Sequence, residues 1–181
     1  MEEADIEEML CVLDENGNST GKLEKKSIVH ANKIFHNEIV LWIIDKQNKS
    51  VLLERRSANK KLDPNKLAPV AGHVSEYETL EEALFRETLE EIGVDVSSYE
   101  IKKLCAYKVE TESNCCFQHH YYTYAKLKTE ELKIQLSELS EVLYVDYLEL
   151  KHKMLTDDDD TVFKKSVNHV KLFECLDKVV L

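Results

Sequence analysis

The sequence predicts an α/β fold in which a mixed β-sheet carries helices on its faces. Apolar runs rich in β-branched residues, typical of strands, are interleaved with segments of helical periodicity. Several of these strands follow one another across short turns, as hairpins do. Because both arrangements occur together, we expect a mixed sheet with helices packed against it.

The N-terminal half contains most of the predicted strands. Residues 8–14 read as a strand that ends at the turn signal DENGN. The apolar run EIVLWIID, at 38–45, predicts a buried strand, and the turn KQNKS leads into the next strand at 51–56. A polar stretch around Pro64 predicts a loop, after which APVAGHV, at 68–74, predicts a short strand.

The C-terminal half opens with a predicted helix from about Leu80 to Ile92, which Gly93 ends as a C-cap glycine. Three more strands, the last passing into a short helix, and a closing amphipathic helix are predicted over residues 101–110, 117–127, 141–150 and 161–179. The acidic run DDDD, at 157–160, is expected to favour the N-terminus of the closing helix, where negative charge complements the helix dipole.

Length and composition indicate one compact domain. The chain has 181 residues, of which 43% are hydrophobic and 33% charged, as is ordinary for a globular protein. A chain of this length buries a core without disulfides or a structural metal. We expect a single domain over 1–181, with a short N-terminal extension at 1–8 and the closing helix at 161–179.

Charge and cysteine usage restrict the partners and the compartment. The formal net charge of −11 argues against general affinity for nucleic-acid polymers. The five cysteines show neither a disulfide framework nor a zinc-binding spacing, so we expect reduced thiols in the cytosol. The acidic start is unlike a signal peptide, and no apolar stretch approaches the roughly 20 residues that cross a bilayer.

The segment 72–94 places acidic side chains where a cation could bind. Glu87, Glu90 and Glu91 are spaced i, i+3 and i+4, so they lie on neighbouring turns of one helix face. Carboxylates at this spacing repel one another, and a hard cation such as Mg²⁺ removes the conflict because it takes oxygen ligands. The backbone carbonyl of Gly72 could also reach the metal. The alternative is a surface helix with a solvated acidic face.

The complete spacing favours a cation site over a solvated face. Seven fixed positions and a following apolar residue form one pattern: Gly72, Glu78, Arg86, Glu87, Glu90, Glu91, Gly93 and Val94. A chance match is on the order of 10⁻⁸ per starting position. The pattern resembles the Nudix box. Its mild departure is Thr88, where that family usually has a bulkier aliphatic residue.

This resemblance implies a Nudix fold, an α/β/α sandwich around a mixed β-sheet, and hydrolysis of a diphosphate linkage with Mg²⁺ or Mn²⁺. By the same resemblance, Glu87, Glu90 and Glu91 match the glutamates that bind metal and supply the general base. Arg86 and Glu78 match the pair that braces the loop and the helix, so Arg86 joins the catalytic group and Glu78 supports it. Dimers are common in this family, which suggests a homodimer by analogy.

The flanks of the box resemble one branch of the family, the hydrolases similar to isopentenyl-diphosphate isomerase. DENGNSTGKLEKKSIVH is similar to that branch's N-terminal turn, basic segment and histidine, and ERRSANKKLDP to its basic loop. With the box, the resemblance covers about residues 10–150. Arg56 and Lys60 in the basic loop can hold phosphate oxygens, and Lys26 is a further candidate. A solvated loop is the alternative.

Ala71, beside the box, separates hydrolysis from isomerisation. The isomerases carry a catalytic cysteine directly before the glycine of the GH pair, and alanine cannot transfer a proton. The box is also intact here, whereas it is degenerate in the isomerases. Cys115 and Cys116 are adjacent strand residues that point to opposite faces, so we interpret them as ordinary thiols and not as replacements.

Four histidines, His30, His36, His119 and His120, could form a separate metal cluster. In the isomerases, histidines and acidic residues of matching segments bind a metal. The later segment here, NCCFQHHYY, lacks the expected glutamate, so packed or surface histidines are the preferred interpretation.

The sequence therefore predicts a cytosolic Mg²⁺-dependent hydrolase of nucleoside di- or triphosphates or related nucleoside diphosphate derivatives. One alternative is an isopentenyl-diphosphate isomerase, against which Ala71 argues. The other is a non-catalytic module that binds a nucleotide. A module without turnover has no need of all three box carboxylates, which favours the hydrolase.

Overall fold

The structure, a computed structural model, describes residues 7–112, 114–156, 160–162 and 167–181. Within these ranges the strands are β1 (Met9–Leu13), β2 (Ser19–Lys25), β3 (His36–Asp45), β4 (Ser50–Arg56), β5 (Leu67–Ala68), β6 (Val70–His73), β7 (Lys102–Glu110), β8 (Cys115–Tyr124) and β9 (Leu139–Asp146). The helices are α1 (Lys26–Ala31), α2 (Leu80–Ile92), the short 3₁₀ helix η1 (Thr129–Glu131), α3 (Tyr147–Leu155) and α4 (Val167–Val180).

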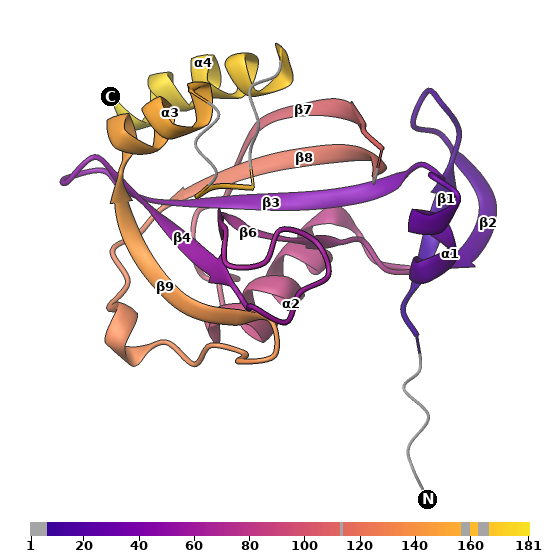
Figure 1. The fold of residues 1–181 in the computed structure, drawn as a ribbon, viewed down its shortest axis with the longest axis horizontal. Coiled ribbons are helices and arrows are strands. Elements are labelled where there is room, and N and C mark those ends of the chain that lie inside the picture. Colours follow the sequence, from indigo (N-terminus) through magenta and orange to yellow (C-terminus); the bar gives the residue numbers. More distant parts are fainter. Residues whose placement is uncertain (1–6, 113, 157–159, 163–166) are drawn as a thin grey trace, which may run out of the picture.

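The main sheet is mixed, as predicted. Strands β3 and β8 run parallel, while β7 with β8, β4 with β9, and β6 with β3 are antiparallel. Helix α2 covers one face of the sheet, and α3 and α4 cover the other (Figure 1). The three layers confirm the predicted α/β/α sandwich.

Strand β3 joins the two cores of the sandwich. Ile39, Leu41 and Ile43 belong to the core on the α2 side, whereas Val40 and Trp42 belong to the core beneath α3 and α4. Alternate residues of a strand point to opposite faces, so a strand buried on both faces must be apolar throughout. This explains the unbroken apolar run in the sequence.

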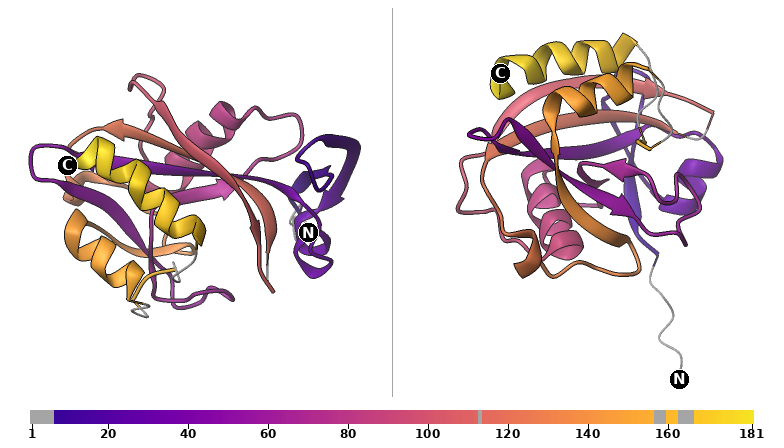
Figure 2. Two further views of the ribbon diagram at one scale, coloured as in Figure 1. Left: turned by 90° about the horizontal axis from the view of Figure 1, so that it is seen from above. Right: turned by 60° about the vertical axis from the view of Figure 1, so that its left-hand side comes forward.

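Strand β2 and helix α1 were not predicted from the sequence. They pack with β1 beyond one end of the main sheet, as the views in Figures 1 and 2 show. Strand β2 has the sequence STGKLEK and is largely exposed, so it carries no apolar alternation. Its pairing with β1, from Met9 opposite Lys25 to Leu13 opposite Ser19, forms the strand instead.

The predicted strand at 68–74 is two short strands with different partners, since β5 pairs with β4 and β6 pairs with β3. The closing helix also differs from its prediction. Helix α4 is described from Val167, and residues 163–166 lie outside the described ranges. The predicted start at 161 is wrong, because Thr161 forms a parallel bridge with Leu67 at the sheet edge.

The acidic run at 157–160 is described only at Asp160, which pairs with basic side chains. Asp160 forms ion pairs with Arg55 and Lys153, at 2.9 and 3.0 Å, before the described start of α4. The other three aspartates lie outside the described ranges. Among the described helices, none is long and apolar enough to cross a membrane.

Candidate active site

Helix α2 is fixed at both ends, which positions its glutamates. Thr79 and Glu82 form a reciprocal capping box, and Gly93 ends the helix in the left-handed conformation with φ of 72°. On the buried side, the Thr88 hydroxyl donates to the Leu84 carbonyl at 2.7 Å. The threonine that departs from the family pattern is therefore accommodated within its own helix.

The three box glutamates occupy different environments. Glu91 is 9% exposed and faces the sheet, whereas the Glu90 side chain is 53% exposed. Glu87 lies between them in burial and packs against Gly72, where a Cβ would overlap the Glu87 carboxyl group. The helix thus directs Glu87 and Glu91 inward and leaves Glu90 at the rim of the site.

Arg86 connects the helix to the loop before it. Its guanidinium donates to both carboxylate oxygens of Glu78, at 2.6 and 2.9 Å, and to the His73 carbonyl at 3.0 Å. Its remaining Nη1 donates to Glu87 at 3.0 Å and to Glu90 at 3.2 Å. One arginine therefore orients the loop and two of the box carboxylates.

Strand β4 brings a carboxyl group that the sequence analysis did not single out. Glu54 is 2% exposed, and its carboxyl group interacts with that of Glu91. Burial and the charge of Glu91 raise the pKa of Glu54 well above its ordinary value. One sequence feature could have indicated Glu54: it is an acidic residue at the end of the apolar run VLLE, inside a predicted strand.

Burial also perturbs the two inward box glutamates. Desolvation raises the pKa of Glu87 to about 7, although Arg86 opposes the shift. Desolvation and the charge of Glu87 raise the pKa of Glu91 to about 8. Carboxyls that ionise only near neutral pH are typical of sites that bind cations or transfer protons.

The three predicted phosphate ligands lie near these carboxyls, each already paired. The Arg56 guanidinium donates to the Leu62 carbonyl at 3.1 and 3.3 Å. Lys60 forms an ion pair with Glu138, whose charge acts on Glu91. Lys26 pairs with Glu8 at 2.8 Å, and its charge acts on Glu87. The charges of Arg56 and Lys26 thus act directly on carboxyl groups of the site, whereas Lys60 is connected to it through Glu138.

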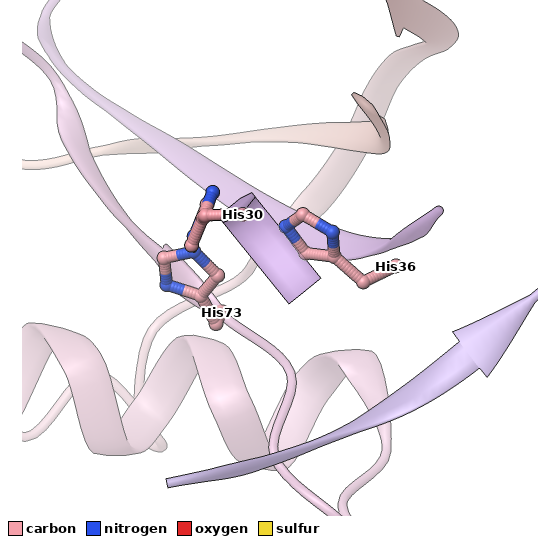
Figure 3. Close-up of side chains that lie close together, drawn as sticks. All are labelled: His30, His36 and His73. Carbon is pink, nitrogen blue, oxygen red and sulfur yellow. The ribbon is translucent and has the colours of Figure 1, made fainter. Parts of the chain in front are cut away.

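The structure groups His30 and His36 with His73, not with His119 and His120 (Figure 3). One ring nitrogen from each of the three lies within 4.8 Å of the others, with the Nε2 atoms of His30 and His73 2.9 Å apart. His119 instead contacts Asn37, and His120 accepts from Trp42. The antiparallel pairing of β3 with β6 places His36 near His73, and His30 on α1 contacts His73.

A carboxylate completes this histidine cluster. Glu38 Oε1 lies 3.4 Å from His36 Nε2 and 3.7 Å from His73 Nε2. Burial lowers the pKa of His73 to about 3, so its ring is neutral at neutral pH, the form that binds metals. A donor set of imidazoles and one carboxylate suits Zn²⁺ or a similar transition metal. Glu38 comes from β3, not from the segment where a glutamate was sought.

Comparison with known proteins connects this chain to one protein family. A family model described as NUDIX domain matches residues 35–165. Nudix hydrolase 3 of Arabidopsis thaliana is 28% identical over 181 aligned residues, which cover 94% of this chain and 23% of that protein. The isopentenyl-diphosphate Delta-isomerase of Citrobacter koseri is 33% identical over 92 residues, half of each chain.

Solved structures share the fold. The crystal structure of DR0079 from Deinococcus radiodurans matches with a TM-score of 0.73 and 19% identity, covering 93% of this chain and 99% of that one. At this identity the likeness concerns the fold alone.

The two curated relatives are longer than the matched region. The chain spans 23% of Nudix hydrolase 3 and 50% of the isopentenyl-diphosphate Delta-isomerase.

Proposed function

The chain belongs to the Nudix family, and on that premise we propose that it is a metal-dependent hydrolase that cleaves a diphosphate linkage. The proposed substrate is a nucleoside di- or triphosphate or a related nucleoside diphosphate derivative. The observation that carries the proposal is the pair of inward carboxyls, Glu87 and Glu91, held on a doubly capped helix beside basic residues.

The donor atoms fit a hard cation. Glu91 has a buried carboxylate oxygen without a hydrogen-bond partner among the described residues, and Glu87 packs against the backbone of Gly72. Oxygen donors of this kind favour Mg²⁺ or Mn²⁺. When bound, such an ion neutralises phosphate charge, stabilises the leaving oxygen and activates water.

The residues of the site have separate roles in the proposed reaction. Glu87 and Glu91 hold the cation, and a carboxyl with a pKa near neutrality can also accept a proton. Arg86 keeps Glu87 oriented through its contact at 3.0 Å. Arg56 and Lys60 exchange their present partners for phosphate oxygens when substrate binds.

A substrate panel tests this function. The full chain is incubated with nucleoside di- and triphosphates and nucleoside diphosphate sugars, with Mg²⁺ or Mn²⁺, and the products are identified by mass spectrometry. We expect release of phosphate, pyrophosphate or a nucleoside monophosphate from at least one compound. Absence of any product, together with absence of binding to either metal, would contradict the proposal. Tight nucleotide binding without turnover would instead support a binding module.

Isomerisation of isopentenyl diphosphate is the second candidate, and the histidine cluster with Glu38 is the observation that favours it. Ala71, exposed on β6, argues against it because alanine cannot carry a proton. Deuterium exchange into isopentenyl diphosphate in ²H₂O discriminates the two. We expect no exchange, and exchange would reverse the ranking.

A further inference from the structure

We infer that Glu54 on β4 is an additional ligand of the catalytic cation, which is then held between strand β4 and helix α2. This inference rests on the proposed function and adds a residue from outside the box. Glu54 is almost fully buried, yet its Oε2 has no hydrogen-bond partner among the described residues. The Oε2 of Glu91, its neighbour across the layer, is in the same condition.

The position of Glu54 in the strand directs it toward the site. Leu52, two residues earlier, belongs to the core beneath α2, and alternate residues of a strand share a face. The backbone is held on both sides, because Glu54 pairs with Ala68 on β5 and with Val142 on β9. The carboxyl therefore projects from a rigid strand toward a rigid helix, which is the arrangement that preorganises a metal site.

A structural role for Glu54 does not explain the carboxyl. The neighbouring β4 residues Val51, Leu52 and Leu53 are buried and apolar, so an apolar side chain would fit this layer. An unpaired buried carboxylate is strongly destabilising, and a second carboxyl opposite adds repulsion. A divalent cation between the two carboxylates removes their repulsion and satisfies both free oxygens.

Two substitutions test the inference by metal binding, independently of turnover. Glu54→Gln keeps the shape of the protonated carboxyl, and Glu54→Met places an apolar side chain of similar length in a buried strand. Mn²⁺ binding to the full chain is measured by titration calorimetry and by the EPR signal of free Mn²⁺. We expect both variants to bind Mn²⁺ at least about tenfold more weakly than the unmodified chain, because even residues beyond the ligands cost about that much.

Glu141→Gln is the matched control. Glu141 lies on the adjacent strand β9, its side chain is 53% exposed, and its loss changes the net charge by the same amount. It should bind Mn²⁺ as the unmodified chain does. Without metal, Glu54→Gln should melt at or above the temperature of the unmodified chain, since a buried carboxyl is removed.

The outcomes separate the inference from the proposed function. If either folded Glu54 variant binds Mn²⁺ with unchanged affinity, Glu54 is not a ligand and the hydrolase proposal stands. If the unmodified chain neither binds Mn²⁺ nor hydrolyses any compound of the panel, the proposed function itself fails. If Glu141→Gln weakens Mn²⁺ binding as much as the Glu54 variants do, the loss of one negative charge explains the effect. That result would overturn the assignment of Glu54 as a ligand.

Discussion

Gly72 on β6 and Glu87 on α2 lie directly against each other, and a Cβ on Gly72 would overlap the Glu87 carboxyl group. Gly72 does not have a positive φ, in contrast to Gly17, Gly21 and Gly93. The glycine is therefore required for space and not for an unusual backbone angle. The absence of a side chain at Gly72 leaves the space in which the Glu87 carboxyl group lies.

Gly72→Ala should damage the site. The added methyl group must displace the Glu87 carboxyl group, which lies at the end of a flexible side chain, so we expect a larger effect on the site than on the free energy of unfolding. Turnover should fall by roughly 100-fold, because small displacements of catalytic groups are costly. Urea unfolding and steady-state kinetics provide the measurements. Ala106→Ser adds one atom on the exposed face of β7 and serves as the control; wild-type kinetics in Gly72→Ala would contradict the contact.

Glu91→Gln should abolish turnover while the fold persists. The amide retains the shape of the carboxyl but cannot hold a cation as a carboxylate does, and metal-ion catalysis contributes several kcal/mol, so we expect a loss of at least about 100-fold. Far-UV circular dichroism checks the fold. Glu81→Gln removes an exposed acid from the same helix and should remain active. Unchanged turnover in Glu91→Gln would remove that residue from the site.

The metal-free protein should lose stability as pH rises toward 8. Glu87 and Glu91 have folded-state pKa values of about 7 and about 8, above their ordinary value. The folded chain then binds more protons than the unfolded chain, so the stabilisation is complete at acidic pH and is lost as pH rises through these values. Thermal unfolding in EDTA from pH 5 to pH 8 measures the effect.

Comparison with Glu91→Gln isolates this carboxyl from other titrating groups. The variant should show a smaller decline over the same interval, since buried neutral histidines such as His120 contribute equally to both proteins. Identical profiles for the two proteins would show that Glu91 does not titrate in this range.

Arg86→Lys should weaken both stability and turnover. Lysine cannot reproduce the two bonds to Glu78 together with the bonds to His73 and Glu87. Because the arginine is partly exposed, we expect a loss of about 1–2 kcal/mol in the free energy of unfolding. Arg55→Lys is the control, since Arg55 has similar exposure but pairs away from the box. An equal effect in both variants would contradict the bracing role.

Arg56→Ala should raise KM more than it lowers kcat, because a group that holds phosphate in the ground state contributes to binding in every step. A charged hydrogen bond contributes about 1.5–3 kcal/mol, which corresponds to a rise of roughly tenfold or more in KM. Lys61→Ala removes a charge from an exposed position of the same loop and provides the control. If KM is unchanged for every substrate, Arg56 does not bind phosphate and only stabilises its loop.

Patterns within short segments allowed much of the fold to be predicted. The interval from Leu80 to Ile92 is helical as its periodicity and terminal glycine indicated, and the apolar run of β3 is buried on both faces. Strand β2 escaped prediction because its residues are polar and its conformation depends on pairing with β1. Helix α1 has six residues, too few to show a periodic apolar face.

In the candidate site, too, some features follow from local sequence patterns and others only from the tertiary structure. Helical spacing placed Glu87, Glu90 and Glu91 on one face, because residues three and four apart share a helix face whatever surrounds them. The complete pattern and its resemblance to the Nudix box then singled them out together with Arg86. Burial then separated the inward glutamates from Glu90. The packing of helices against strands brought Glu54 on β4 opposite Glu91 on α2, and His73 on β6 beside His30 on α1. Such contacts join segments far apart in the chain, so they follow from how strands and helices pack and not from any local pattern.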